Sequence, residues 1–377
     1  MKRIYSLDVL RGLAIFIMVF VDAPPAGVAY PIFIHAAWEG LTFADFAFPG
    51  FVFAMGLSAA VSMSKRKPST KKILKRAAIL FAIGILFNML PLIFAWLIRD
   101  DFTGSNFIAS IEHLRFFGIL QRLALTYAFG MLIVLAVEQR VTYVRELYPF
   151  KAAFALLIIS SIGFHVYAPD NPFDQAHNLS QAVDYILPGV NHIYEPTHDP
   201  EGLYGTIAST ASFLFGFFEG RIIIKGNSPT NEKVTVLVAA AVILFIAGSL
   251  WSIVDIIAKK LWTAPFALIT SGVEIFLLAT LIYLFDKLPR SKKFFQPLCA
   301  VGMNPLFFFL LTNIALMFLY TIPSPVEGMS LYVWIFQCTF SHLLTPEFGS
   351  MIFCLLWCVL WLPIAEILYK MNITIKI

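Results

Sequence analysis

Charged residues are scarce in this sequence of 377 residues. Asp, Glu, Lys and Arg together make up 13% of it, against 59% hydrophobic residues, and the mean hydropathy is +0.81. A soluble domain averages about 25% charged residues, so this deficit excludes an ordinary water-soluble domain and indicates a protein whose solvent is lipid. Runs of about 20 apolar residues recur along the chain, the length of a helix that crosses a bilayer. The composition therefore predicts an all-α integral membrane protein.

Cysteine is also rare, and all four residues lie in the last third of the chain: Cys299, Cys338, Cys354 and Cys358. None belongs to a CxxC pair, so we interpret them as small buried hydrophobic residues. Metal-binding patterns are absent as well, because there is no HExxH motif and the histidines of the segment 169–202 are scattered along it. A metal site needs three or four converging ligands, so we expect no metal cofactor.

Ten apolar segments are long enough to cross a bilayer as helices, which predicts a bundle of about ten spans. They are 7–25, 46–64, 77–98, 116–137, 151–168, 203–224, 234–254, 264–285, 298–320 and 347–369. No internal repeat, low-complexity linker, P-loop or dinucleotide-binding fingerprint is found, which favours one transmembrane domain over residues 1–377. The stretch 329–344, "MSLYVWIFQCTFSHLL", is short for a crossing, so we expect it to be re-entrant or interfacial on the outer side.

Basic residues predict the orientation of this bundle. The connection 65–76, "KRKPSTKKILKR", carries seven Lys and Arg, and three further even-numbered connections carry three, three and four. By the positive-inside rule these connections and both termini are cytoplasmic, whereas the loops 26–45 and 169–202 lie outside. Lys2 and Arg3 precede the first apolar run as in a signal peptide, but charged residues interrupt that run and we expect a retained helix.

Three charged residues lie in or at the ends of the first predicted span: Asp8, Arg11 and Asp22. Their spacing places them on roughly one helix face, with Asp8 and Asp22 about 21 Å apart along the axis. A charge that faces lipid costs on the order of 2.5–3.5 kcal/mol, so this face points into the protein. Asp8 and Arg11 either form a buried structural pair or serve function. Asp22, near the outer boundary without a basic neighbour, favours function.

Two polar side chains, Gln121 and Arg122, lie inside the apolar helix of "GILQRLALTY". The guanidinium group is a permanent planar cation with five donors, which suits a phosphate or carboxylate ligand. A structural partner, such as Asp8 or another helix carboxylate, is the alternative.

The segment 198–220 opens the sixth predicted span with "HDPEGLYGTIAS". Pro200 and the small residues after it predict a helix start with a smooth face for close packing. Asp199 and Glu201 precede that N-terminus, where a carboxylate is stabilised by about 0.3–1 kcal/mol. They therefore either cap the helix or bind a substrate.

The segment 31–56, "PIFIHAAWEGLTFADFAFPGFVFAMG", brings a histidine and two carboxylates to the start of an apolar helix. His35 and Glu39 would share one face of a helix, where an imidazole beside a carboxylate can act as a general base near pH 7. Alternatively His35 is an interfacial residue and Trp38 a membrane-belt anchor. Asp45 stands where the apolar run begins, and we expect it to cap that helix.

Several blocks of the chain resemble the heparan-alpha-glucosaminide N-acetyltransferase family. They are "SLDVLRGLAIFIMVFVD", "HAAWEGLTFADFAFPGFVFAMG", "GILQRLALTY", "DPEGLYGTIAS" and "LWTAPFALITSG", which occur in the family's order and cover most of the chain. The combination is specific, although "LDVLRG" alone is not.

The resemblance implies a transmembrane enzyme that moves acetyl from cytosolic acetyl-CoA to the amino group of a terminal glucosamine across the membrane. It assigns catalysis to the histidine of the "HAAW" block, His35. The family usually has Asn at the end of its first span, where this chain has Asp22, a second catalytic candidate. No lumenal domain precedes Met1, so we expect a multi-pass bacterial inner-membrane homologue with its outer loops in the periplasm.

Candidate ligand contacts follow from the same resemblance and the polar residues above. For the acceptor sugar they are Trp38, Glu39, Asp199 and Glu201. For acetyl-CoA they are Arg11, Gln121, Arg122 and Trp262. We expect an amino-sugar acceptor, membrane lipid around the bundle, a homodimer and no nucleic-acid partner. The imidazole could take a proton from the amine or accept the acetyl group itself, and the sequence leaves both open.

Two other functions remain as alternatives. Membrane O-acyltransferases also carry an "LDxLRG"-like start, but they typically place a histidine eleven residues after the arginine, where this chain has Asp22. A sugar or muropeptide transporter could also have ten spans with buried charges, but it should show broken helices in matching halves, and none is evident in the sequence.

Overall fold

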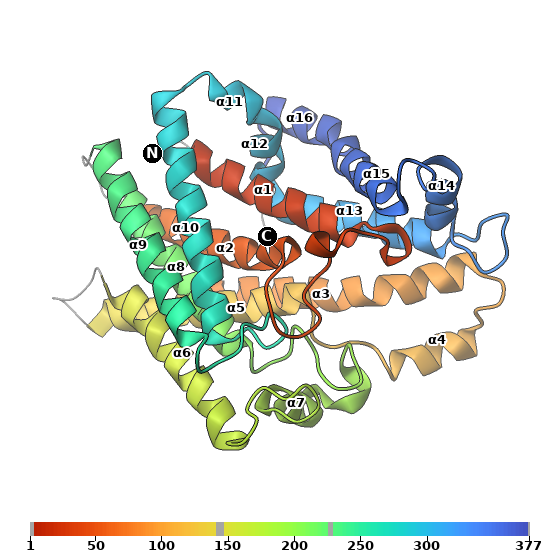
Figure 1. The fold of residues 1–377 in the computed structure, drawn as a ribbon, viewed down its shortest axis with the longest axis horizontal. Helices are drawn as coiled ribbons and strands as arrows, with labels where there is room; N and C mark the ends of the chain where they lie inside the picture. Colours follow the sequence, from red (N-terminus) through yellow and green to blue (C-terminus); the bar gives the residue numbers. More distant parts are fainter. Residues whose placement is uncertain (1–3, 141–146, 225–228, 376–377) are drawn as a thin grey trace.

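The computed structural model describes residues 4–140, 147–224 and 229–375, and this part of the chain folds into helices without a β-sheet (Figure 1). The long helices are α1 (Tyr5–Asp22), α2 (Ala47–Lys65), α3 (Thr70–Ile98), α5 (Ile119–Arg140), α6 (Tyr148–Tyr167), α8 (Thr206–Ile224), α9 (Thr230–Trp251), α10 (Ala264–Lys287), α13 (Pro305–Thr321) and α15 (Pro346–Leu360). The short ones are α4 (Gly104–Ile111), α7 (Leu179–Asp184), α11 (Ser291–Phe294), α12 (Gln296–Met303), α14 (Leu331–Thr339) and α16 (Leu362–Lys370). The all-α membrane fold class is confirmed.

Among the described residues, eight helical segments are long and apolar enough to cross a membrane, or nine if the bent pair α12 and α13 is one span. The last of the eight, Pro346–Lys370, combines α15 and α16. Helix α1 is not among them, because three charged residues interrupt its 18 residues. It nevertheless packs inside the bundle, against α2 and α12.

The predicted span 298–320 is wrong as a single helix, because it is bent by 90° between α12 and α13. Pro305 lacks a backbone N–H and disfavours a helical conformation at the preceding residue, so the helix breaks at Asn304. The buried Asn304 side chain donates to the carbonyl of Ile373 (3.0 Å) and accepts from the N–H of Ile375 (2.7 Å). The break is therefore held by the C-terminal segment.

Glycines set the closest helix contacts. Gly56 of α2 and Gly216 of α8 each lie against a backbone carbonyl of the other helix, where a Cβ atom would clash. Gly12 of α1 and Gly302 of α12 are packed in the same way. Small residues allow such approach inside a membrane, so these contacts explain how α1 and α8 pack tightly in the centre of the bundle.

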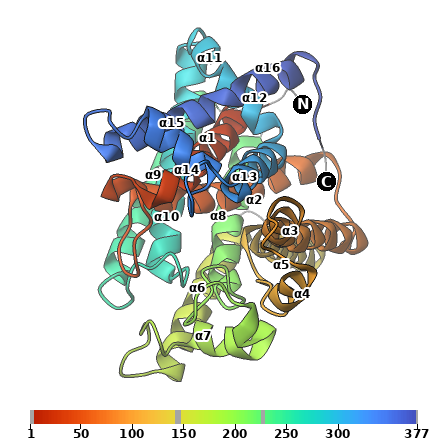
Figure 2. The same cartoon turned by 90° about the vertical axis from the view of Figure 1, so that its right-hand side faces the viewer.

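Three connections meet over one end of the bundle. The loop 23–46, which contains two short 3₁₀ turns before the turn Phe43–Phe46, donates from Gly40 N–H to the carbonyl of Ile257 in the loop 252–263 (2.8 Å). The third connection, residues 168–205, contains α7, which Figure 2 shows at the opposite end of the molecule from α11 and α16. Helix α14 has nine residues, about 13 Å, which is too short to cross a bilayer by itself.

The orientation of the bundle in a membrane stays a prediction. Residues 141–146 and 225–228, which belong to two of the predicted basic connections, lie outside the described residues, as do Lys2 and Arg3.

Candidate active site

His35 is held by Asp45, the residue that begins the second span. The His35 Nδ1 atom lies 2.8 Å from Asp45 Oδ1, and Asp45 Oδ2 accepts from the N–H groups of Ala36 (3.2 Å) and Thr42 (2.9 Å). Asp45 is fully buried, whereas 37% of the His35 side chain is exposed. The prediction that Asp45 caps the second span is wrong in detail, because no side chain caps α2; Asp45 instead accepts from the Thr42 N–H in a capping box around the turn Phe43–Phe46 that leads into α2. The sequence did not reveal its second role in orienting His35.

The predicted shared helix face of His35 and Glu39 is wrong, because residues 34–42 do not form a helix. Gly40 has a φ of +113°, which a helix does not allow. Glu39 is exposed to solvent. Trp38 donates from Nε1 to the carbonyl of Phe173 (2.9 Å) and packs edge-on against the His198 ring, so it joins two loops.

Lys259 contacts His35, and the sequence did not single it out. Its Nζ atom lies 3.0 Å from both ring nitrogens of His35 and 3.9 Å from Asp45 Oδ1. Because the ionised Asp45 accepts a hydrogen bond from His35 Nδ1, that nitrogen carries the proton and Nε2 keeps its lone pair. Lys259 Nζ lies beside the ring, equally far from both nitrogens, and is not directed at that lone pair. Burial lowers the pKa of Lys259, although the carboxylates of Glu201 and Asp45 oppose the shift.

Two more carboxylates lie near this pair. Asp22, exposed at the end of α1, is close enough to His35, Lys259 and Glu201 for their charges to interact. Glu201 is mostly buried, and its charge also acts on Lys259. His35 and Lys259 thus lie near three acidic side chains, Asp22, Asp45 and Glu201, which come from three separate segments.

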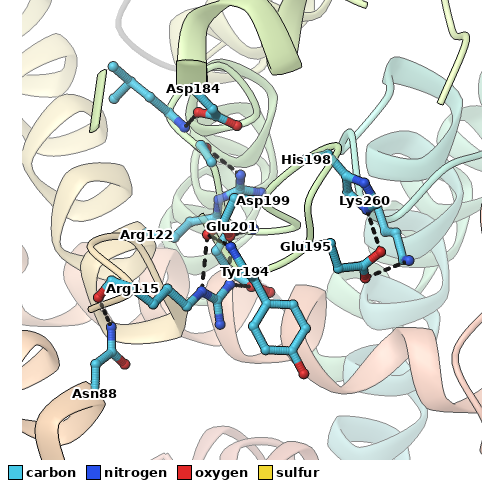
Figure 3. Close-up of polar contacts among 12 residues, drawn as sticks. Asn88, Arg115, Arg122, Asp184, Tyr194, Glu195, His198, Asp199, Glu201 and Lys260 are labelled. Carbon is cyan, nitrogen blue, oxygen red and sulfur yellow. Dashed lines mark hydrogen bonds and ion pairs between the residues drawn. The ribbon is translucent and has the colours of Figure 1, made fainter. Parts of the chain in front are cut away.

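Glu201 is held in place by an arginine cluster (Figure 3). Arg115 pairs with Glu201 and with both oxygens of Asp199, at 2.6 and 3.0 Å for the latter. Burial alone would raise the pKa of Glu201, but Arg115 and then Arg122 outweigh it, so that pKa is lowered. Asp199 also accepts from the N–H groups of Tyr194 (3.0 Å) and Glu201 (2.9 Å), so its carboxylate anchors the loop.

Arg122 is fully buried and donates from Nη2 to the carbonyl of Gly202 (2.5 Å). Its guanidinium group also lies 5.5 Å from the ring of Trp262. Asp184 accepts a hydrogen bond from the N–H of the following residue, Leu203 (2.8 Å). The segment before α8 is therefore bound on its carbonyl side by Arg122 and on its N–H side by Asp184. Among the described residues, Arg122 Nε and Nη1 and Gln121 Nε2 have no hydrogen-bond partner. These buried donors can therefore bind a polar ligand.

Arg11 lies in the N-terminal half of α1, away from Asp22 at the C-terminal end of this helix. It pairs with Asp8 (3.4 Å) and donates to Ser58 of α2. The structure thus contains the predicted ion pair between Asp8 and Arg11, although 24% of the Arg11 side chain is exposed.

A second histidine–aspartate pair involves Asp255, in the loop 252–263 that also carries Lys259. His165 Nε2 of α6 is 2.8 Å from Asp255 Oδ1, and Ser161 donates to Asp255 Oδ2 (2.6 Å). Asp255 belongs to the loop that carries Lys259, so this pair ties that loop to α6.

Comparison with known proteins confirms the family resemblance. Residues 3–164 match the family described as heparan-alpha-glucosaminide N-acetyltransferase, catalytic. The human heparan-alpha-glucosaminide N-acetyltransferase is 26% identical over 433 aligned residues, which cover 100% of this chain and 60% of that protein. The mouse protein of the same name is 27% identical over 359 residues, covering 80% and 52%. The chain thus spans little more than half the length of these curated relatives. His35 and Asp45 lie in the matched segment, whereas Glu201 and Lys259 lie beyond it.

Proposed function

We propose that this protein is a transmembrane N-acetyltransferase that moves acetyl from cytosolic acetyl-CoA to the amino group of a glucosamine-type sugar on the other side of a bacterial inner membrane. One observation carries the proposal: in a segment similar to acetyltransferases, Asp45 orients the His35 imidazole so that Nε2 presents a lone pair among acidic side chains.

His35 performs the chemistry in one of two ways. An ammonium group must lose a proton before it attacks a thioester, and Nε2 can take that proton while Asp45 stabilises the resulting imidazolium. Alternatively, Nε2 attacks the thioester carbon, the C–S bond breaks, and the acetyl group passes from the imidazole to the amine. In both routes the buried Asp45 fixes the same nitrogen for reaction.

The acidic side chains select the acceptor. Asp22 and Glu201 lie near His35 and attract the ammonium form of an amino sugar, which must approach Nε2. Glu39 is exposed nearby in sequence and is available to the sugar, whereas Trp38 and Asp199 hold the loops that frame the site. We therefore assign acceptor binding to Asp22, Glu39 and Glu201.

Acetyl-CoA has polar amide and phosphate groups that need donors inside the bundle. Arg122 and Gln121 supply buried N–H groups with no partner in the described part of the chain, and Trp262 packs beside Arg122. We assign these three residues to the donor molecule. Arg11, bound to Asp8 and Ser58, contributes to helix packing instead.

We further propose that both termini are cytoplasmic and that the loops 26–45 and 169–202 are periplasmic. The charge asymmetry of the sequence supports this orientation. A single domain over 1–377 and a homodimer in the membrane complete the proposal. Cysteine substitutions in 169–202 should react with an impermeant thiol reagent in intact cells, and those in 65–76 should not.

The test uses purified protein in lipid vesicles with glucosamine inside and acetyl-labelled acetyl-CoA outside. We expect labelled N-acetylglucosamine in the lumen and free CoA thiol outside, in equal amounts, in those vesicles whose protein is oriented with its termini outwards. Label transferred to a hydroxyl group would support the O-acyltransferase alternative. Movement of sugar without consumption of acetyl-CoA would support a transporter, and either result would overturn the proposal.

A further inference from the structure

We propose that Lys259 is a catalytic residue of the acetyl transfer at His35, and that its ammonium group donates to the acetyl carbonyl oxygen as negative charge develops there. This inference rests on the proposed function and adds a residue that lies outside the segment matched to the family.

The position of the lysine nitrogen is the first argument. Nζ lies 3.0 Å from both Nδ1 and Nε2 of His35, so it is not aligned with one lone pair but lies beside the ring. In the base route, the amine that bonds to the acetyl carbon also gives its proton to Nε2, so the acetyl carbon lies close to this nitrogen. In the relay route, Nε2 bonds to the acetyl carbon directly. A donor this close to Nε2 is within reach of the oxygen bonded to that carbon, the requirement for oxyanion stabilisation.

The second argument is that the lysine is pre-positioned. Its loop is fixed by the Gly40–Ile257 hydrogen bond (2.8 Å) and by the attachment of Asp255 to α6. Thr263 Oγ1 also donates to the carbonyl of Ile256 (2.7 Å). The Lys259 side chain itself is 13% exposed. A long side chain held in this way loses little entropy when it binds the transition state, which is the condition for an effective electrostatic catalyst.

Other roles for Lys259 explain the geometry less well. An ion pair between Lys259 and Asp45 would be weak, because Nζ lies 3.9 Å from Asp45 Oδ1 but only 3.0 Å from His35 Nε2. As an acetyl carrier it would form an amide, the same bond type as the product, which an amine cannot readily displace. As a donor to the carbonyl oxygen it needs no covalent change, and the carboxylates of Glu201 and Asp45 favour its charged form.

The experiment compares Lys259→Met, Lys259→Ala and a matched control, Lys260→Ala. The neighbouring Lys260 pairs with Glu195 (2.9 Å) instead of His35. We expect both Lys259 variants to lose about 10²–10³-fold in kcat while the Kd for acetyl-CoA changes by less than about threefold. Trimethylammonium, which donates an N–H but forms no stable amide, should restore part of the activity of Lys259→Ala. Lys260→Ala should retain the kcat of the parent.

A pH profile separates catalysis from a structural effect. Because the pKa of Lys259 is lowered, the parent should lose kcat on the alkaline side below the ordinary lysine value, as the ammonium deprotonates. Lys259→Arg should move that loss to higher pH, since arginine stays protonated.

A kcat within threefold of the parent in Lys259→Met would overturn the inference, as would an unchanged alkaline limb in Lys259→Arg. If the parent transfers no acetyl group, or if His35→Ala remains active, the proposed function itself fails. An inactive His35→Ala beside an active Lys259→Met rejects only the role of Lys259.

Discussion

Two histidine–aspartate pairs in this protein have the same N···O distance and similar burial, but they use different ring nitrogens, Nδ1 of His35 and Nε2 of His165, and have different surroundings. His35–Asp45 and His165–Asp255 both have an N···O distance of 2.8 Å, with histidine side chains 37% and 36% exposed and aspartates buried. At the first pair, the ring faces Lys259 and lies near further carboxylates. At the second, Ser161 binds the other carboxylate oxygen and Phe173 packs edge-on against the ring.

The difference shows that the pair itself does not define the chemistry. At His165 the carboxylate stands between the hydroxyl group and the imidazole, so the ring cannot activate Ser161 as it would in a Ser–His–Asp triad. That pair joins a loop to a helix. At His35 the ring lies beside Lys259 and near further carboxylates, and the proposed chemistry depends on these charged groups.

The largest contrast is expected from removing each histidine. His35→Ala should lower kcat by about 10²–10⁴-fold, because a positioned base or nucleophile is lost. His165→Ala should lower it by no more than about tenfold, because Ser161 still holds Asp255. Steady-state transfer from acetyl-CoA to glucosamine by purified variants that bind CoA measures both. Equal losses would contradict the division of roles.

The second largest contrast is expected from substituting the two aspartates, Asp45 and Asp255. In Asp45→Asn, one oxygen cannot accept from Ala36, Thr42 and His35 together, so the tautomer of His35 with its proton on Nδ1 is no longer favoured. We therefore expect kcat to fall by about 10²-fold. Asp255→Asn keeps the size of the anchor, and we expect a fall in Tm with a smaller effect on kcat. Circular dichroism melts alongside kinetics separate the two. A larger kinetic loss in Asp255→Asn would reverse the comparison.

A smaller effect is expected from a change at Asp22, a carboxylate near the His35–Asp45 pair. Asp22→Asn removes a charge that attracts the acceptor amine, so kcat/KM for glucosamine should fall by about tenfold. The KM for acetyl-CoA should stay the same, since Asp22 is not assigned to the donor. If both substrates are affected alike, Asp22 serves the chemistry or the fold and not acceptor binding.

The smallest effect concerns Asp184, a buried aspartate without a histidine. Burial raises its pKa from the ordinary 3.8 to about 7, although the Leu203 N–H opposes the shift. The folded state therefore binds the proton more tightly than the unfolded state, and stability should fall as pH rises from about 4 to about 7. In melts at pH 5 and pH 8, the Tm of Asp184→Asn should fall less than that of the parent. Parallel pH dependences would show that another group titrates.

The apolar runs were sufficient to predict where most of the long helices lie, because in lipid a backbone can satisfy its hydrogen bonds only within a helix or a closed barrel. His35 and Asp45 were found because both stand at a helix start within one short segment. Lys259 was not, since its contact with His35 spans 224 residues and depends on how two loops meet. Its only signal was a lysine pair directly before the "LWTAPF" block.

The break at Asn304 was missed for another reason. The segment 298–320 is apolar throughout, and hydropathy does not distinguish a straight helix from a bent one. The dipeptide Asn304-Pro305 was the available signal, because the residue before a proline is biased away from the helical conformation. What the sequence could not show is that the Asn304 side chain finds partners near the C-terminus.

Asp45 has a consequence for the evolution of this surface. The same carboxylate stabilises the turn that leads into α2 and orients the ring to which we assign catalysis, so under this proposal selection for stability and selection for activity act on one side chain. Asparagine at this position would have one acceptor oxygen in place of two. Substitutions at many catalytic positions lower activity and raise stability, but a mutation of Asp45 should lower both. Adaptation to a new acceptor must instead begin among the separate loops that supply Asp22, Glu39 and Glu201.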